Sequence, residues 1–162
     1  MKKPILFLSL LFTAALTFTD CSKKSSKPTP AAPTIAKNTL IISGTGGITE
    51  QFSFVNSIAN GVSFVVQGAP NSSGTVPAGE YSLQVQFTTG TIPSGTFAIG
   101  GSVVTLVSLY DSNNNVWTAS TGNVTVTNNS NGITATFFNL TFAANSSQSP
   151  ATIVASGSVT GD

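Results

Sequence analysis

Short runs in which apolar and polar residues alternate with a period of two dominate the chain from Thr39 onward. The clearest run has one apolar set and one polar set in strict alternation: Tyr81, Leu83, Val85 and Phe87 against Ser82, Gln84 and Gln86. This period is that of a β-strand with one buried and one solvated face. No stretch of ten residues combines a helical period with helix-forming composition, so we expect almost no helix in this region.

Other segments fit the same pattern. Val124 and Val126 alternate with threonines, and the segment 133–142 is apolar on both faces, which predicts a strand in the middle of the fold. In that segment Phe138, Leu140 and Phe142 are the stronger apolar set. Further core candidates are Ile42, Phe52, Phe54, Phe64, Val66, Val103, Val107 and Ile153.

Glycine- and asparagine-rich turns separate these runs, at 44–47, 60–61, 113–115, 121–123 and 131–132. Both residue types tolerate the positive φ that tight hairpin turns require. The sequence therefore predicts an all-β domain over residues 38–162, either an antiparallel β-sandwich or a partly closed barrel of about 8–10 short strands.

Charge is distributed very unevenly along the chain. All six basic residues are lysines, and the last of them is Lys37. From Asn38 to Asp162 there is no Lys, Arg or His, and the acidic residues are Glu50, Glu80, Asp111 and Asp162. A nucleic-acid site needs cations to neutralise phosphates, so this domain is not expected to bind nucleic acid or, through salt bridges, any other anion.

The first 20 residues have the pattern of an export signal. A positive start is followed by an apolar run over 4–18, which is shorter than the ~20 residues needed to span a bilayer. Cys21 is the only cysteine and cannot form an internal disulfide. The segment resembles bacterial lipoprotein signals, although Asp20 replaces the small residue usual before the cysteine. The resemblance implies lipidation of Cys21. The alternatives are cleavage by the general signal peptidase, which would leave a free thiol, and an uncleaved membrane anchor.

Residues 21–37 are rich in Lys, Pro and Ser and show no apolar period, which is typical of a tether. Lysines at its start could contact anionic head groups. We therefore expect a protein anchored through lipid to the outer membrane, on a face that the sequence does not specify.

Part of the domain resembles small all-β lipoproteins of Bacteroidota whose function is unknown. The segments that carry the resemblance are Tyr110, 117–119, Gly122, 124–126, 136–142 and 155–159. What the resemblance implies is a β-domain at the cell surface or in the periplasm.

The residue types for catalysis are scarce. Without histidine, and with Cys21 lipidated, neither Ser-His-Asp nor Cys-His nucleophiles nor His- or Cys-ligated zinc can form. We expect no enzyme, no cofactor and no metal. A carboxylate-dependent glycan-active enzyme is the remaining catalytic alternative; it would need two of Glu50, Glu80 and Asp111 close together, and both glutamates fall at positions expected to be solvated.

One segment imitates the start of a calcium loop. Asp111 is followed by asparagines at 113 and 115, but Val116 and Gly122 stand where such a loop needs Gly and Glu. We interpret the segment as an asparagine-rich hairpin.

Tyr110, Asp111 and Trp117 form the candidate ligand surface. Exposed aromatic rings beside Asn, Asp and Gln bind sugars by stacking and hydrogen bonding, although aromatic residues in β-proteins are more often buried. The leading hypothesis is a non-catalytic binding, adhesion or structural module with a neutral glycan or protein partner. A small-ligand carrier with a cavity inside a barrel is the alternative.

From Asn38 onward the sequence offers no lysine to protect exposed sheet edges. The edges are therefore expected to be short, covered or paired with another chain.

Overall fold

The structure, a computed structural model, describes residues 33–44, 47–88 and 90–161. The signal segment, Cys21 and the tether up to residue 32 lie outside them. The described residues belong to one compact unit, Pro33–Asp162, and contain eleven strands, one more than the upper number expected. They contain no helix, and so none that could cross a membrane. The strands are β1 (Thr39–Ser43), β2 (Ile48–Gln51), β3 (Phe54–Ala59), β4 (Ser63–Ala69), β5 (Ser82–Thr88), β6 (Gly95–Ala98), β7 (Val104–Tyr110), β8 (Val116–Ala119), β9 (Asn123–Asn129), β10 (Gly132–Ala144) and β11 (Thr152–Gly161).

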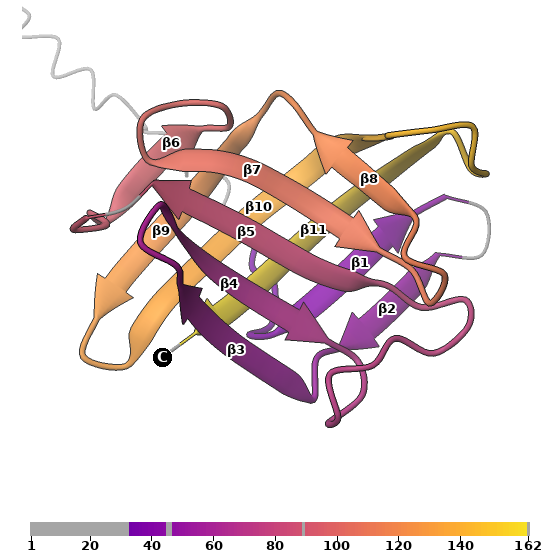
Figure 1. The fold of residues 1–162 in the computed structure, drawn as a ribbon, viewed down its shortest axis with the longest axis horizontal. Helices are drawn as coiled ribbons and strands as arrows, with labels where there is room; N and C mark the ends of the chain where they lie inside the picture. The colour runs from indigo at the N-terminus through magenta and orange to yellow at the C-terminus, as the bar shows by residue number, and fades with distance from the viewer. Residues whose placement is uncertain (1–32, 45–46, 89, 162) are drawn as a thin grey trace, which may run out of the picture. The chain divides into compact units, whose positions relative to one another are not determined.

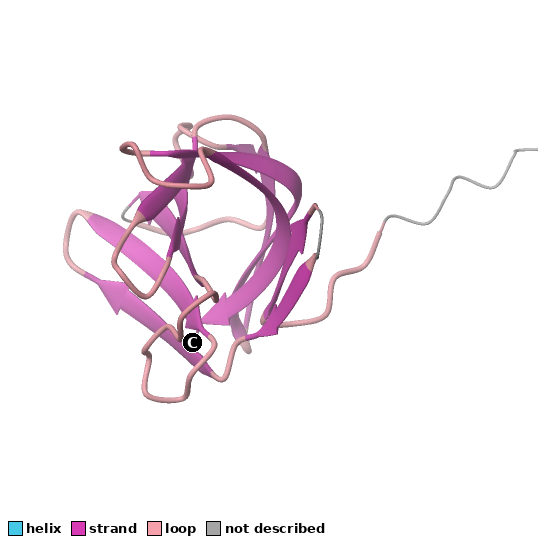
Figure 2. Ribbon diagram, turned by 90° about the vertical axis from the view of Figure 1, so that its right-hand side faces the viewer, coloured by secondary structure: helices cyan, strands magenta, loops and turns pink. Residues whose placement is uncertain are grey.

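The strands form one sheet in the order β2-β1-β11-β10-β8-β7-β5-β4-β3, and each pairing of strands in it is antiparallel. A side branch consists of β9, which pairs with β10, and β6, which pairs with β9. The sheet curls into a half-barrel, with β5 and β7 crossing in front of β10 and β11 (Figures 1 and 2). Because of this curl β11 contacts β4 and β3, from which it is remote in strand order. The predicted all-β antiparallel class is confirmed.

A β-bulge in β10 decides which of its phenylalanines enter the core. The register shifts between Phe137 and Leu140, and Asn139 takes the left-handed conformation with φ 49°. An inserted residue reverses the alternation of side chains, so Phe137 and Leu140 are both buried while Phe138 is 36% exposed. The prediction that Phe138 shares a buried face with Leu140 and Phe142 is therefore wrong.

The interior of the half-barrel is filled by large side chains. Its largest members are fully buried: Trp117, Phe87, Phe137, Phe142, Leu40, Leu83 and Leu109. Phe137 and Phe142 pack edge to face, with their ring centroids 5.9 Å apart. Of the further core candidates, Phe52, Val66, Val107 and Ile153 are buried, and Ile42, Phe54, Phe64 and Val103 are half-buried.

Two features protect edge strand β2 from pairing with another chain. It is only four residues long, and its Glu50 points toward the interior, since its Cα is paired with that of fully buried Leu40. A short edge and an inward-pointing charged residue both hinder pairing with another chain. No lysine is needed for that protection.

Candidate functional site

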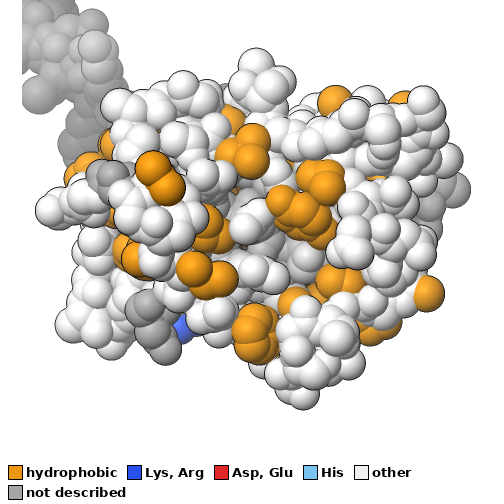
Figure 3. Space-filling model, in the orientation of Figure 1, with side chains coloured by type: hydrophobic (Ala, Val, Ile, Leu, Met, Phe, Trp, Pro, Cys, Tyr) orange, Lys and Arg blue, Asp and Glu red, His pale blue; other side chains and the backbone are white. Residues whose placement is uncertain are grey.

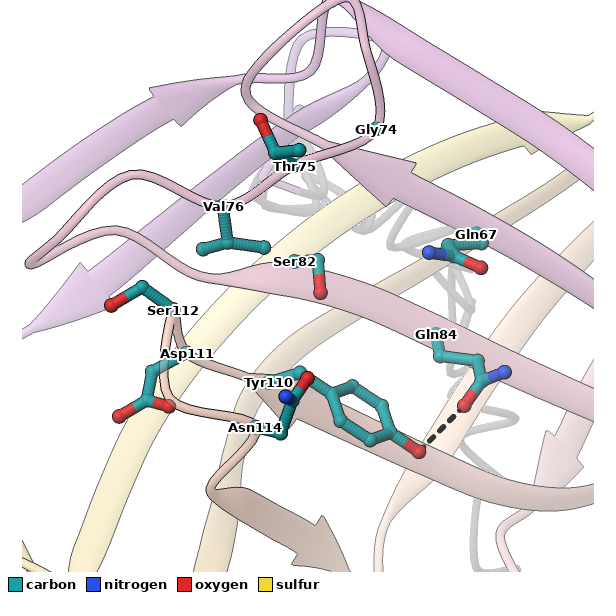
Figure 4. A pocket seen from close by; sticks show the side chains of 10 residues that line it. All are labelled: Gln67, Gly74, Thr75, Val76, Ser82, Gln84, Tyr110, Asp111, Ser112 and Asn114. Carbon is teal, nitrogen blue, oxygen red and sulfur yellow. Dashed lines mark hydrogen bonds between the residues drawn. The ribbon is translucent and has the colours of Figure 1, made fainter.

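A cleft of about 460 Å³ lies on the outer face of the half-barrel, over β4, β5 and β7. Two connections form its walls: the loop 70–81, between β4 and β5, and the hairpin loop 111–115, between β7 and β8 (Figure 4). Most of the residues that line it are uncharged and polar. The full lining is Gln67, Gly74, Thr75, Val76, Ser82, Gln84, Tyr110, Asp111, Ser112 and Asn114.

Strand register brings the floor of the cleft together. Leu83 and Val85 are fully buried, so alternation turns Ser82 and Gln84 to the opposite, outer face. Across the strands, Ser82 is paired with Tyr110, and Gln84 with Gln67. Directly opposed residues of antiparallel strands share a face, which explains why residues from three strands line one cleft.

Tyr110 is held in a fixed orientation within this floor. Its hydroxyl group donates a hydrogen bond of 2.7 Å to Oε1 of Gln84 (Figure 4). The side chain is half-buried, so part of it is open to solvent. The site thus combines an oriented aromatic ring with neighbouring amide and hydroxyl groups.

Asp111 organises the hairpin loop that borders the cleft. Its Oδ1 accepts hydrogen bonds from the backbone N–H groups of Asn113 (2.8 Å) and Asn115 (2.9 Å), and its Oδ2 accepts one from Nδ2 of Asn115 (2.8 Å). Burial alone would raise the pKa of Asp111, but these three bonds outweigh it and hold that pKa below its ordinary value. Because β7 and β8 pair directly, the interpretation of this segment as a hairpin is confirmed.

The opposite wall, loop 70–81, is also fixed by internal hydrogen bonds. Oδ1 of Asn71 accepts bonds from the backbone N–H (3.0 Å) and hydroxyl (3.1 Å) of Ser73, and the Ser73 and Thr75 hydroxyls are 2.9 Å apart. Gly74 has φ +80°, a conformation that favours glycine, beside the Phe54 ring. This wall is a defined part of the cleft.

Trp117 does not belong to this surface. It is 1% exposed, its ring packs edge to face on Tyr81 at 5.5 Å, and its Nε1 donates to the Pro150 carbonyl oxygen at 2.6 Å. The hairpin pairs Tyr110 with Val116 and Leu109 with Trp117. Tyr110 and Trp117 therefore face opposite sides of the sheet, and the prediction that they share a ligand surface is wrong for Trp117. Tyr110 and Asp111 do line one cleft.

Sequence reasoning missed Gln67 and the loop residues 74–76 as parts of the site. The solvated face of the 81–87 run already contained Ser82 and Gln84, which is a usable signal. The pairing of β4 with β5 and the path of the loop over them are tertiary features, which the alternation within a single strand does not encode.

The carboxylates are divided between two clefts. Glu50 and Glu80 line a smaller cleft of about 270 Å³, whereas Asp111 lines the larger one. Glu50 is only 5% exposed, so the expectation of a solvated position is wrong for this residue. The cause is the register of β2, which turns position 50 inward.

Glu50 has an unusual electrostatic environment. Desolvation by burial raises its pKa to about 7, with a smaller contribution from the charge of Glu80, while the backbone N–H of Tyr81 acts in the opposite direction. Both carboxyl oxygens lie 3.1 Å from that nitrogen. The carboxyl group is thus bound to Tyr81, the residue directly before β5.

The face that bears β4, β5 and β7 is almost entirely uncharged. Backbone and uncharged polar side chains, drawn in white, cover most of it, interspersed with hydrophobic side chains (Figure 3). The larger cleft, which contains Tyr110, is called the Tyr110 cleft below. Asp111 is the one charged residue that lines it, and the Asp111 carboxylate accepts hydrogen bonds from within its own loop. No protein-family model matches the chain, and no curated protein or solved structure shows significant similarity to it.

Proposed function

We propose that this protein is a non-catalytic binding module of the cell envelope, anchored through lipid on Cys21, and that the Tyr110 cleft binds a neutral saccharide. The observation that carries the proposal is the oriented Tyr110 ring, fixed to Gln84 among amide and hydroxyl side chains on an uncharged face.

The chemistry of the cleft matches that of a sugar. A saccharide presents an apolar C–H face that stacks on an aromatic ring and a rim of hydroxyl groups that need hydrogen-bonding partners. Tyr110 supplies the ring, and Gln67, Gln84 and Asn114 supply amides that both donate and accept. An anionic ligand would find no cation among the residues that line the cleft.

The packing of the interior favours a surface site over a carrier. Trp117, Phe87, Phe137 and Phe142 occupy the centre of the half-barrel with at most 1% exposure. A carrier needs interior space for its ligand. The Tyr110 cleft, by contrast, lies on the side of the sheet opposite to this core.

A carboxylate-dependent enzyme is the second candidate, because Glu50 and Glu80 share a cleft and the pKa of Glu50 is raised to about 7. The binding function is favoured, since both oxygens of Glu50 are directed at the Tyr81 amide and its burial leaves little access for a substrate. If the protein hydrolyses glycans, Glu50→Gln and Glu80→Gln will each abolish that hydrolysis, and a glycan-release assay measures it.

The saccharide proposal is tested by screening the purified protein on an array of neutral glycans and titrating the best ligand by calorimetry. Tyr110→Ala should weaken its binding at least about tenfold, because loss of the stacking face removes on the order of 1.5 kcal/mol. Tyr110→Phe, which keeps the ring but loses the bond to Gln84, should have a smaller effect.

Phe138→Ala is the matched control, since Phe138 is an exposed aromatic residue that does not line this cleft. Its binding should equal that of the wild type. Equal affinities of the wild type and Tyr110→Ala would contradict the assignment of the cleft, and an array without any bound neutral glycan would contradict the ligand class.

A further inference from the structure

Glu50 connects edge strand β2 to the polypeptide that forms one wall of the Tyr110 cleft. Its carboxyl group accepts the hydrogen bond of the Tyr81 backbone N–H, at the junction of loop 70–81 and β5. The next residue, Ser82, lines the cleft, and so do Gly74, Thr75 and Val76 earlier in the same loop. Glu50 itself does not line that cleft.

Tyr81 strengthens the connection from its other side. Its ring packs edge to face on the buried Trp117, with ring centroids 5.5 Å apart. The backbone N–H of Tyr81 is thus held by Glu50 while its side chain is held by the core. A change in the charge of Glu50 therefore acts at Tyr81, where loop 70–81 joins β5.

The charges around Glu50 are all negative or remote. Glu80 lines the same small cleft as Glu50. The Tyr81 hydroxyl is also nearby: burial and the negative charges of Asp111 and Glu50 raise its pKa. The one cation among the described residues, Lys37, is exposed and is no cause of the Glu50 shift. Ionised Glu50 would therefore be a buried carboxylate without a compensating cation.

We propose that Glu50 is a positioning residue for the Tyr110 cleft: its buried carboxyl group fastens loop 70–81 to β2 through the Tyr81 backbone N–H, and its ionisation, which favours hydration of the carboxylate over burial, loosens the loop and lowers affinity for the saccharide. The fastening of the loop depends only on the geometry of Glu50 and Tyr81. The consequence for affinity rests on the proposed function.

The direction of the pH effect follows from the pKa of Glu50. That pKa is about 7 with the loop closed and returns toward the ordinary glutamate value of 4.5 when the loop opens and the carboxyl group is hydrated. The closed form then binds more protons between these values, so its stability is complete at acidic pH and is lost as pH rises through about 7. Opening should become roughly 30-fold more frequent between about pH 5.5 and about pH 8.5.

Hydrogen exchange at the Tyr81 amide measures this opening directly. In the full chain, purified in detergent, the protection of this amide, corrected for the intrinsic rate, should fall by roughly 30-fold over that pH range. In Glu50→Gln, which keeps an acceptor oxygen but cannot ionise, the protection should not depend on pH. In Glu80→Gln the dependence should remain, with its midpoint at lower pH because one repelling charge is removed.

The outcomes separate the two proposals. A pH-dependent protection of Tyr81 that disappears in Glu50→Gln supports the positioning role, whether or not a saccharide binds. The same pH dependence in the wild type and Glu50→Gln overturns it. If the exchange result is as expected but saccharide titrations show equal affinity at pH 5.5 and 8.5, the link to the cleft is overturned while the fastening stands.

Discussion

Replacing Phe137 with alanine will destabilise the domain by about 3–5 kcal/mol, whereas replacing its neighbour Phe138 will cost less than about 1 kcal/mol. Phe137 is 1% exposed and packs edge to face on Phe142. Its ring also fills the space beside Gly157, where an added Cβ would lie 2.8 Å from the Phe137 ring. Because Gly157 has no side chain, it cannot fill the cavity that the truncation of Phe137 leaves.

The difference between the two residues comes from the bulge. Phe138 is 36% exposed on the outer face because the inserted residue reverses the alternation of β10. Urea unfolding followed by circular dichroism measures both variants, with the wild type as reference. Comparable losses for the two variants, or a larger loss for Phe138→Ala, would contradict the placement of the bulge.

Cys21→Ala should shift the protein from the membrane fraction to the soluble fraction. The prediction follows from the sequence: an apolar segment of 15 residues precedes the only cysteine, and a lysine-containing polar segment follows it. Without the thiol no thioether-linked lipid can form, and the remaining lysines supply only about 1 kcal/mol each toward an anionic surface.

Cell fractionation followed by immunoblotting measures the distribution. Ser22→Ala is the control, since it changes the adjacent polar residue and leaves the thiol in place. The lipid-anchor proposal fails if Cys21→Ala and the wild type distribute equally between the two fractions.

Alternation within single strands allowed much of the fold to be predicted. The run 81–87 matches β5 (Ser82–Thr88) to within one residue, with Leu83, Val85 and Phe87 buried, and Val124 and Val126 are buried in β9 as expected. These predictions succeed because side-chain direction in a regular strand depends only on residue parity.

The sequence predictions are wrong where a bulge breaks the alternation of side chains, or where the result depends on how two strands are aligned. At Phe138 a bulge reverses the alternation, which the run of apolar residues on both faces concealed. At Trp117 the length of the hairpin loop sets which residue opposes Tyr110, and the observed register turns the indole inward. At Glu50 the pairing of β2 with β1 buries a carboxyl group that local sequence places in a polar turn region.

The Tyr110 cleft could be predicted only in part for the same reason. Tyr110 and Asp111 were identified from their chemistry, because an aromatic ring beside Asn and Asp is typical of sugar contact. Gln67 and Thr75 join them through the β4–β5 pairing and through the loop that crosses over it. Contacts of this kind depend on tertiary structure and leave no periodic signal in the chain.

The most direct test of the binding proposal is nuclear magnetic resonance of the isotope-labelled protein during titration with the best neutral saccharide from the array. We expect the largest amide shifts at Ser82, Gln84, residues 110–112 and Asn114, which line the cleft. Shifts concentrated instead around Phe138, or among core residues such as Phe87, would contradict it.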